Sequence, residues 1–127
     1  MTDRVELAAR LFRAFAEGDD AAARDLLAPD FVGVQNGGPA MDRETLLRFA
    51  GAFRAVVRDY RYENVTCVQT DTGFVEEHDV CGTLADGTQV RLPACVVAEV
   101  RDGKIEAIRE YFDSVRVTAV AKALGTR

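Results

Sequence analysis

A chain of 127 residues that is 48% hydrophobic and 29% charged has the composition of one soluble globular domain, which excludes disordered and collagen-like chains. The formal net charge of −5 argues against nucleic-acid binding, because domains that bind phosphate backbones usually carry a basic patch or stripe. No apolar run approaches the ~18 residues that span a bilayer, and no signal-peptide pattern opens the chain. We therefore predict a cytoplasmic protein without a membrane segment.

The first residues predict two helices separated by a glycine. Asp3 is a candidate N-cap with Glu6 three residues later, which is the spacing of a capping box, and Gly18 is a natural stop. Asp19 can begin a second, shorter helix that ends before Pro29.

A short strand over residues 31–34 and a loop lead to a third helix. Asp42 is the candidate N-cap of this helix. The apolar residues that follow recur at helical spacing and form one stripe: Leu46, Phe49, Ala50, Phe53 and Val57.

From Tyr60 onward the apolar pattern changes to a period of two residues, which is typical of strands. The expected strands cover residues 60–70, 73–84, 89–100 and 105–112. Asp86-Gly87 and Asp102-Gly103 favour two-residue type I′ turns, because both turn positions need a positive φ. After the last strand, Ser114 can begin a short closing helix.

Helices followed by consecutive hairpins predict an α+β fold. We expect a curved antiparallel sheet that forms a cone-shaped half-barrel, closed on one face by the N-terminal helices. A single domain over residues 1–127 accommodates these elements, since no linker, repeat or low-complexity segment interrupts them.

Two of the expected strands carry acids beside apolar residues. In the last strand, alternation puts Glu110 on the same face as Ile108 and Phe112. In an earlier strand, Glu77 and Asp79 share a face that also carries apolar residues. Both strands are therefore predicted to aim carboxylates at a partly apolar interior.

The cysteines and the histidine favour neither a disulfide framework nor a zinc site. Cys67, Cys81 and Cys95 form an odd number without a CxxC pair, and His78 is the only histidine. We expect buried free thiols, no metal and no cofactor.

Several segments along nearly the whole chain carry a resemblance to a known family. They are the helix from Arg4-Val5-Glu6-Leu7 to Phe15-Ala16-Glu17-Gly18-Asp19, the strand Asp30-Phe31-Val32, and the endings Val100-Arg101-Asp102-Gly103-Lys104-Ile105 and Glu110-Tyr111-Phe112-Asp113. These segments resemble the SnoaL-like polyketide cyclases of the nuclear transport factor 2-like superfamily. Ketosteroid isomerases, scytalone dehydratase and limonene epoxide hydrolase belong to the same superfamily. The resemblance implies a cystatin-like α+β barrel, and it is weak for the reaction because this fold hosts many chemistries.

Within the superfamily, the chain is similar to limonene epoxide hydrolase in part of its catalytic pattern. That pattern is Arg-x-Asp on one strand, an aspartate in a Trp-Arg-Asp-Tyr-Phe-Asp ending, and a Tyr-x-Asn pair that helps to hold the attacking water. The resemblance puts Asp79 at the strand aspartate, Glu77 at the arginine and Glu110 at the final aspartate. Asn36 keeps the asparagine, whereas Val34 replaces the tyrosine.

Three carboxylates in one apolar pocket cannot all ionise cheaply. Two like charges at ~4 Å repel by about 4 kcal/mol at an effective dielectric constant near 20. At least one acid should stay protonated near neutral pH. We assign Asp79 as the base and Glu110 as the proton donor, with Glu77 tuning both, although Asp79 and Glu110 could exchange roles.

The sequence thus predicts a cofactor-independent acid/base enzyme that acts on an apolar, oxygenated small molecule. Epoxide hydrolysis or epoxide-opening cyclisation is the first choice, and ketosteroid isomerase-like or polyketide cyclase-like isomerisation or cyclisation is the second. A small-ligand-binding protein or a dimer scaffold without catalysis is a third interpretation. In that case Glu110 pairs with an arginine, and Asp79 accepts hydrogen bonds from backbone amides.

Other polar residues are left outside the predicted site. His78 is adjacent to Asp79, so strand alternation turns the two side chains to opposite faces. Tyr60 and Tyr62 share a face, and aromatic residues at strand spacing are more often packing or dimer contacts.

Apolar residues complete the prediction on both faces of the sheet. The substrate is expected to contact Asn36 and an apolar wall formed by Phe12, Phe15, Phe49, Phe53, Leu92, Val96 and Phe112. The outer face of the sheet is expected to form a homodimer interface through Phe74, His78, Cys95 and Val97.

Overall fold

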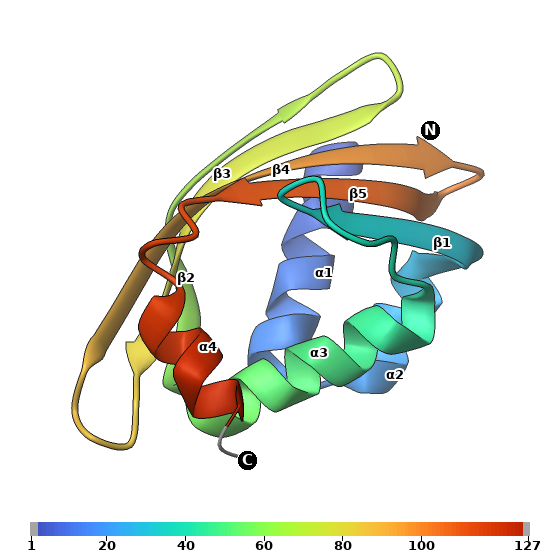
Figure 1. Ribbon diagram of the computed structural model, residues 1–127. Coiled ribbons are helices and arrows are strands. Elements are labelled where there is room, and N and C mark those ends of the chain that lie inside the picture. The colour runs from blue at the N-terminus through green and yellow to red at the C-terminus, as the bar shows by residue number, and fades with distance from the viewer. Residues whose placement is uncertain (1–2, 126–127) are drawn as a thin grey trace.

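The computed structural model describes residues 3–125 as one curved sheet with helices on its concave side (Figure 1). The helices are α1 (Arg4–Glu17), α2 (Asp20–Leu26), α3 (Arg43–Val56) and α4 (Thr118–Gly125). The strands are β1 (Leu27–Gln35), β2 (Arg58–Gln69), β3 (Gly73–Thr83), β4 (Gln89–Arg101) and β5 (Lys104–Phe112). The predicted α+β class with a curved sheet closed by N-terminal helices is confirmed.

The sheet has five strands in the order β1-β5-β4-β3-β2. The four strands from β2 to β5 are antiparallel neighbours, as the hairpin signals predicted. The first strand departs from the prediction, because β1 joins the sheet beside β5 in a parallel direction. This placement brings the end of β1 next to the end of β5.

The predicted helix ends are confirmed by their hydrogen bonds. The Asp3 carboxylate accepts hydrogen bonds from the backbone N–H groups of Val5 and Glu6, at 3.0 and 3.2 Å. Gly18 ends α1 in the left-handed conformation, with φ of 72°. The Asp42 carboxylate accepts from the Thr45 N–H at 2.8 Å and starts α3.

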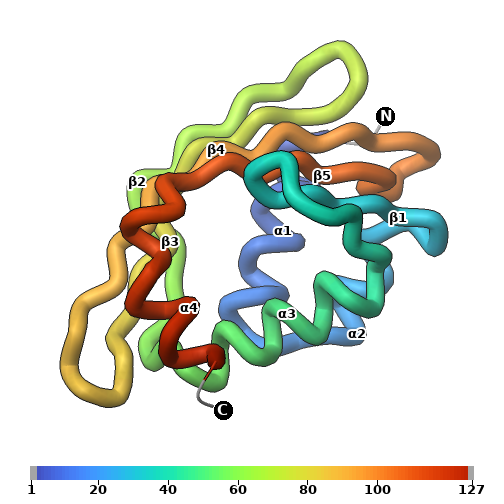
Figure 2. Tube along the Cα trace, viewed as in Figure 1, coloured from blue at the N-terminus to red at the C-terminus, as the bar shows by residue number. Residues whose placement is uncertain are grey.

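The closing helix begins later than predicted. Residues 113–116 form a turn in which Asp113 accepts from the Val115 N–H, and α4 starts at Thr118. Figure 2 shows α4 beside the end of α3. No helix within residues 3–125 is long and apolar enough to cross a membrane.

The two predicted hairpin turns differ from each other. Asp102 and Gly103 both have positive φ, at 54° and 75°, so the type I′ prediction is confirmed there. At the other turn only Gly87 has a positive φ, and its N–H donates to the Leu84 carbonyl at 2.9 Å. The Leu84 N–H donates to the Thr88 carbonyl, which leaves three residues in the loop rather than two. The type I′ prediction at Asp86-Gly87 is therefore wrong.

The extra loop residue decides which side chains of β3 face the helices. Counting back from a two-residue turn would pair Asp79 with Ala94, whose side chain is buried. The observed ladder pairs Asp79 with Pro93 and His78 with Ala94. A shift of one residue moves every side chain of a strand to the other face. The concave face of β3 thus carries Phe74, Glu76, His78 and Val80, and the convex face carries Val75, Glu77 and Asp79.

The core lies between the concave face and the helices. Fully buried side chains from α1, β1, β3 and β5 form its centre, and the largest are Leu11, Leu27, Phe31, Phe74 and Ile105. A second apolar cluster joins the end of α3 to α4 through Phe53, Val57, Val90 and Val120. Between these two clusters the aromatic side chains leave unfilled space.

Gly73 should be the glycine of the sheet that tolerates a side chain least. A Cβ atom there would lie 1.8 Å from the Ala98 carbonyl oxygen, so we expect Gly73→Ala to lower the free energy of unfolding by at least about 2 kcal/mol. Gly51 in α3 is the matched control, because its Cβ would meet nothing nearer than 4.0 Å. Gly51→Ala should raise stability by about 0.5–1 kcal/mol in urea unfolding. Shifts of the same sign in both variants would contradict this packing.

Candidate active site

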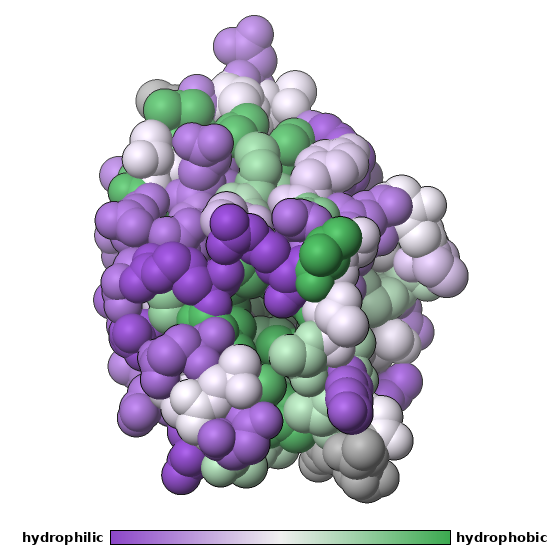
Figure 3. Space-filling view, turned by 60° about the vertical axis from the view of Figure 1, so that its left-hand side comes forward, coloured by the Kyte–Doolittle hydropathy of each residue, from purple (hydrophilic) through white to green (hydrophobic). Residues whose placement is uncertain are grey.

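A cavity of about 90 Å³ lies between the concave face of the sheet, α1 and α3. Its walls are mainly aromatic and comprise Phe12, Phe15, Gln35, Leu46, Phe49, Ala50, Phe53, Tyr60, Tyr62, Val80, Leu92, Glu110, Phe112 and Val117. A smaller cavity of about 40 Å³ adjoins it and shares Gln35 and Glu110 with it. Figure 3 shows hydrophobic residues gathered in a hollow that hydrophilic residues border.

The cavity contains most of the predicted apolar wall. Six of the predicted residues line it: Phe12, Phe15, Phe49, Phe53, Leu92 and Phe112. The seventh, Val96, is buried and lines the smaller cavity. All seven of these apolar side chains therefore face the interior between the sheet and the helices, as predicted.

Among the residues that the structure describes, Glu110 is the one acid that lines the cavity, and no arginine or lysine lines it. The Oε1 atom of Glu110 accepts a hydrogen bond from Gln35 Nε2 at 3.0 Å. Removal from water raises the pKa of the Glu110 carboxyl, while a positive charge on His78 and the Gln35 hydrogen bond act in the opposite direction. Glu110 therefore holds its proton to a higher pH than an exposed glutamate.

The parallel pairing of β1 with β5 puts Gln35 in place. Gln35 and Glu110 are the last pair of residues in the β1–β5 ladder. Asn36, the next residue, binds the backbone of β5. The Asn36 side chain donates to the Phe112 carbonyl and accepts from the Phe112 N–H, both at 2.9 Å. Asn36 was expected to contact the substrate, but it is exposed and both ends of its amide bind the Phe112 backbone. Its neighbour Gln35, which was not predicted as a site residue, faces the cavity.

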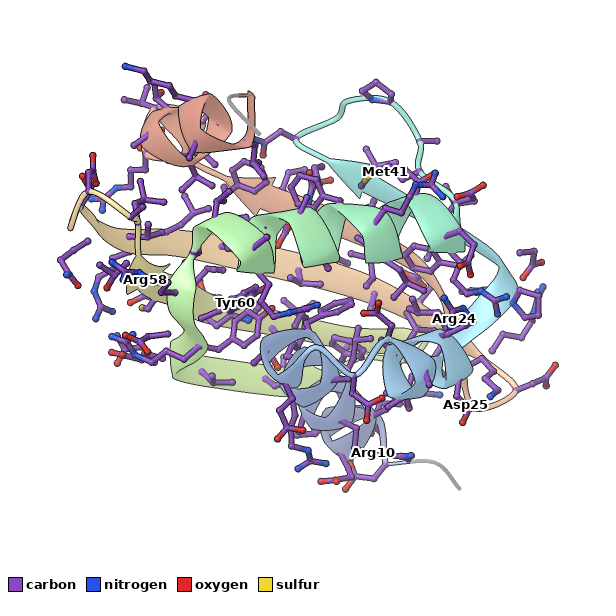
Figure 4. The ribbon with its side chains drawn as sticks, turned by 90° about the horizontal axis from the view of Figure 1, so that it is seen from below. Arg10, Arg24, Asp25, Met41, Arg58 and Tyr60 are labelled. Atoms are coloured by element: carbon purple, nitrogen blue, oxygen red, sulfur yellow. The ribbon has the colours of Figure 1, made fainter. Side chains whose placement is uncertain are left out.

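Tyr60 and Tyr62 also face the cavity, and their hydroxyl groups are hydrogen-bonded to each other. Figure 4 shows the Tyr60 side chain on the concave side of the sheet, beside α3. Burial raises the pKa of Tyr60 to about 12 and raises the pKa of Tyr62 well above its usual value. Both phenols therefore stay protonated at neutral pH, and because one donates its hydrogen to the other, the second can donate a hydrogen bond into the cavity.

Asp79 and Glu77 do not belong to the cavity. Asp79 accepts hydrogen bonds from Asn64 and Arg91, both at 2.9 Å, and Glu77 is exposed. The Asn64 hydrogen bond, with that from Arg91, lowers the pKa of Asp79. The prediction that these two acids share a pocket with Glu110 is wrong, because the β3–β4 register turns them to the convex face.

The concave positions of β3 hold a different pair. His78 Nδ1 lies 2.7 Å from Glu76 Oε2, and both side chains are buried. Phe74 and His78 were expected on the outer face of the sheet, and the same register places them inside. The length of the loop after β3 separates the two possibilities, and the residues Asp86-Gly87 alone do not reveal it.

Within residues 3–125, no group of histidine, cysteine, aspartate and glutamate side chains could hold a metal ion. The three cysteines are free thiols, of which Cys81 is buried and Cys67 and Cys95 are half-buried. Burial and the neighbouring Glu76 carboxylate raise the pKa of Cys67 to about 11, so this thiol is not a ready nucleophile.

The raised pKa of Glu110 predicts a dependence of stability on pH. A group whose pKa is higher in the folded state stabilises the fold below its unfolded pKa, and this stability is lost as the pH rises through the folded pKa. Glu110→Gln removes that loss, so the variant should gain stability relative to the wild type between pH 4 and pH 8. In general, a difference of one pKa unit between the two states corresponds to about 1.4 kcal/mol.

Urea unfolding at the two pH values measures this difference. Glu77→Gln is the matched control, since Glu77 is exposed on the convex face and should leave the pH dependence of the wild type unchanged. Parallel pH profiles for the wild type and Glu110→Gln would show that Glu110 is solvated.

Comparisons with known proteins agree with this geometry. A profile of the SnoaL-like domain matches residues 8–108, and no curated protein sequence matches the chain. IdmH, a proposed polyketide cyclase from Streptomyces antibioticus, is 25% identical with a TM-score of 0.82, over 95% of this chain and 99% of that one. A proposed polyketide cyclase from Xanthomonas campestris pv. campestris is 23% identical with a TM-score of 0.80, over 94% and 96% of the two chains.

A third solved structure is a protein of ketosteroid isomerase-like fold from Catenulispora acidiphila in complex with trimethylamine. It is 18% identical with a TM-score of 0.78 over 92% of each chain. These likenesses extend over nearly the whole chain, and the domain profile covers most of it. The chain therefore belongs to the SnoaL-like domain family and has the ketosteroid isomerase-like fold.

Proposed function

We propose that the protein is an acid/base enzyme that moves a proton on a small apolar carbonyl compound, in an isomerisation or a cyclisation. The observation that carries this proposal is one carboxyl group, Glu110, whose pKa is raised by removal from water inside an aromatic cavity. General acids and bases work best when their pKa lies near the working pH, and burial shifts a glutamate in that direction.

The polar groups of the cavity are sufficient for enolisation. One of the Tyr60 and Tyr62 hydroxyls donates to the other, so the second hydroxyl can donate a hydrogen bond to a carbonyl oxygen, and ionised Glu110 can act as the base. The ionised Glu110 carboxylate takes a proton from the neighbouring carbon, which gives an enolate, and the protonated Glu110 then returns this proton to another carbon, which gives the isomer. In a cyclisation, the enolate carbon attacks a second carbonyl carbon instead, and Glu110 gives its proton to the oxygen of that carbonyl. Gln35 holds the Glu110 carboxyl in one orientation throughout.

The size of the cavity limits the substrate. An apolar cavity of about 150 Å³ holds benzene. The two adjoining cavities, of about 90 and 40 Å³, approach that size, so we propose that the reacting part of the substrate is about one six-membered ring. The aromatic walls favour a hydrocarbon ring with one oxygen that can meet the phenols.

The geometry favours isomerisation or cyclisation over epoxide hydrolysis, which was the first choice from the sequence. The hydrolase pattern needs two acids with an arginine between them in one pocket. Asp79 lies on the convex face, and the two inward polar residues of β3 are Glu76 and His78 rather than arginine and aspartate. Among the described residues that line the cavity, Glu110 is thus left without the second acid that the pattern requires.

Isomerisation of 3-cyclohexen-1-one tests the proposal, because formation of the conjugated enone is followed by ultraviolet absorbance. The wild type should accelerate the reaction, and Glu110→Gln should lower kcat by at least about 100-fold, the usual contribution of a general acid or base. Glu77→Gln should retain the wild-type rate. Wild-type turnover no faster than buffer, or hydrolysis of cyclohexene oxide to the diol instead, would contradict the proposed reaction.

A second candidate is a protein that binds a small ligand without turnover. Aromatic rings surround the Glu110 carboxyl, which suits a small amine, and the Catenulispora acidiphila protein was solved with trimethylamine. Affinity for 2-cyclohexen-1-one and for trimethylamine in Glu110→Gln separates the two functions. An enzyme should keep its affinity for the enone and lose turnover, whereas an amine-binding protein should lose its affinity for trimethylamine.

We also propose a homodimer through the convex face, where Tyr111 is 49% exposed and pairs in the ladder with half-buried Cys95. Val97 lies on the same face.

The predicted cytoplasmic location stays a prediction.

Analytical ultracentrifugation checks the dimer. A tyrosine anchor in an interface contributes about 2 kcal/mol, so Tyr111→Arg should raise the dissociation constant at least about tenfold. Val5→Arg is the control, because Val5 is 38% exposed but lies on α1, on the other side of the sheet. A wild type that sediments as a monomer at high concentration would exclude this interface.

A further inference from the structure

A buried pair of titratable side chains on β3 has no part in the chemistry proposed above. His78 Nδ1 lies 2.7 Å from Glu76 Oε2, with the side chains 0% and 3% exposed. A hydrogen bond to the carboxylate places a hydrogen on Nδ1, so a neutral His78 keeps a lone pair at Nε2. Among buried side-chain nitrogen and oxygen atoms of residues 3–125, Nε2 is the one without a hydrogen-bond partner. Such atoms are rare in folded proteins and often have a function.

The pair lies close to the acid of the cavity. Glu76 is opposite Val96 in the sheet, and Val96 is opposite Glu110, so one strand separates the two carboxylates on the concave face. The His78 ring packs against Tyr62, which lines the cavity, with 4.6 Å between the ring centroids. Charges that interact through such apolar surroundings are weakly screened.

Apart from Asp79, whose pKa is lowered on the convex face, the other titratable groups around His78 stay neutral at neutral pH. Cys67 on β2 is opposite Glu76, and burial raises its pKa to about 11. The phenol of Tyr62, also on β2, has its pKa raised well above the usual value by burial. From α1, the ring facing His78 is that of Phe12, which carries no charge. Glu76 and Glu110 on the concave face, and Asp79 on the convex face, are therefore the acids whose charge His78 experiences.

We propose that His78, held by Glu76, balances the charge of Glu110: Nε2 takes up a proton when Glu110 is ionised and releases it when Glu110 is protonated. The Glu76 carboxylate stabilises the resulting imidazolium through Nδ1. The net charge of the interior then stays constant while Glu110 gives and takes protons. His78 acts through Glu110 and is a positioning residue. This inference rests on the proposed role of Glu110 as the acid of the cavity.

Nitrogen-15 NMR tests the inference without a substrate, because His78 is the only histidine in the chain. Glu110→Gln removes the negative charge, so the ratio of protonated to neutral His78 at pH 7 should fall about tenfold, the equivalent of one pH unit. In the reverse experiment, the carbon-13 titration of the Glu110 carboxyl in His78→Gln should move to higher pH by the same amount. The two changes must be equal, since coupling between two sites is reciprocal.

Glu77→Gln is the control, because it removes one carboxylate from the same strand on the convex face and should leave the His78 signals unchanged. If His78→Gln fails to fold, Glu110→Gln decides alone, since it keeps the Glu76–His78 pair. His78 signals that do not respond to Glu110→Gln would overturn the inference even if the enzyme turns over. Coupled signals in a protein without turnover would sustain the inference and refute the proposed reaction.

Discussion

The pairing of β3 with β4 decides which polar side chains face the interior of this protein. Thr83 and Gln89 are the last partners before the loop, and from there every second residue of β3 faces the helices. Because Glu76 and His78 take these positions, Asp79 remains outside in an ion pair with Arg91. The cavity, as far as the described residues form it, is consequently an aromatic chamber with one acid rather than a cluster of three. The pKa of a single carboxyl group in such surroundings is raised by its loss of hydration and not by repulsion from other acids.

The elements with strong local signals could be read from the sequence. Asp3 and Asp42 begin their helices and Gly18 ends α1, in each case through short-range hydrogen bonds. The period-two pattern located four strands. The residues of the predicted apolar wall also line the two cavities, since large residues such as Phe12 and Phe53 are buried where the helices pack. These features depend on neighbours a few residues apart or on hydrophobicity alone.

Which polar side chains face the cavity depends on pairing between strands, and this pairing cannot be read from single residues. Val75, Glu77 and Asp79 alternate as regularly as Glu76, His78 and Val80, so alternation could not choose the inner face of β3. The choice was made by the conformation of Asp86-Gly87, where only the glycine adopts a positive φ. Gln35 was missed for a related reason, because its position opposite Glu110 follows from a parallel pairing between strands far apart in the sequence.

The segment after β5 has a separate part in this arrangement. Val117 contributes to the cavity wall, while Val120 of α4 packs into the apolar cluster at the end of α3. Neither residue belongs to the strand ladders that orient Glu110, Gln35 and the tyrosine pair. Substitutions between residues 113 and 125 can thus enlarge or shorten the chamber without altering the ladders that hold its polar groups. The length of the chamber and the position of its polar groups are therefore set by different stretches of the chain, so one can diversify while the other is retained.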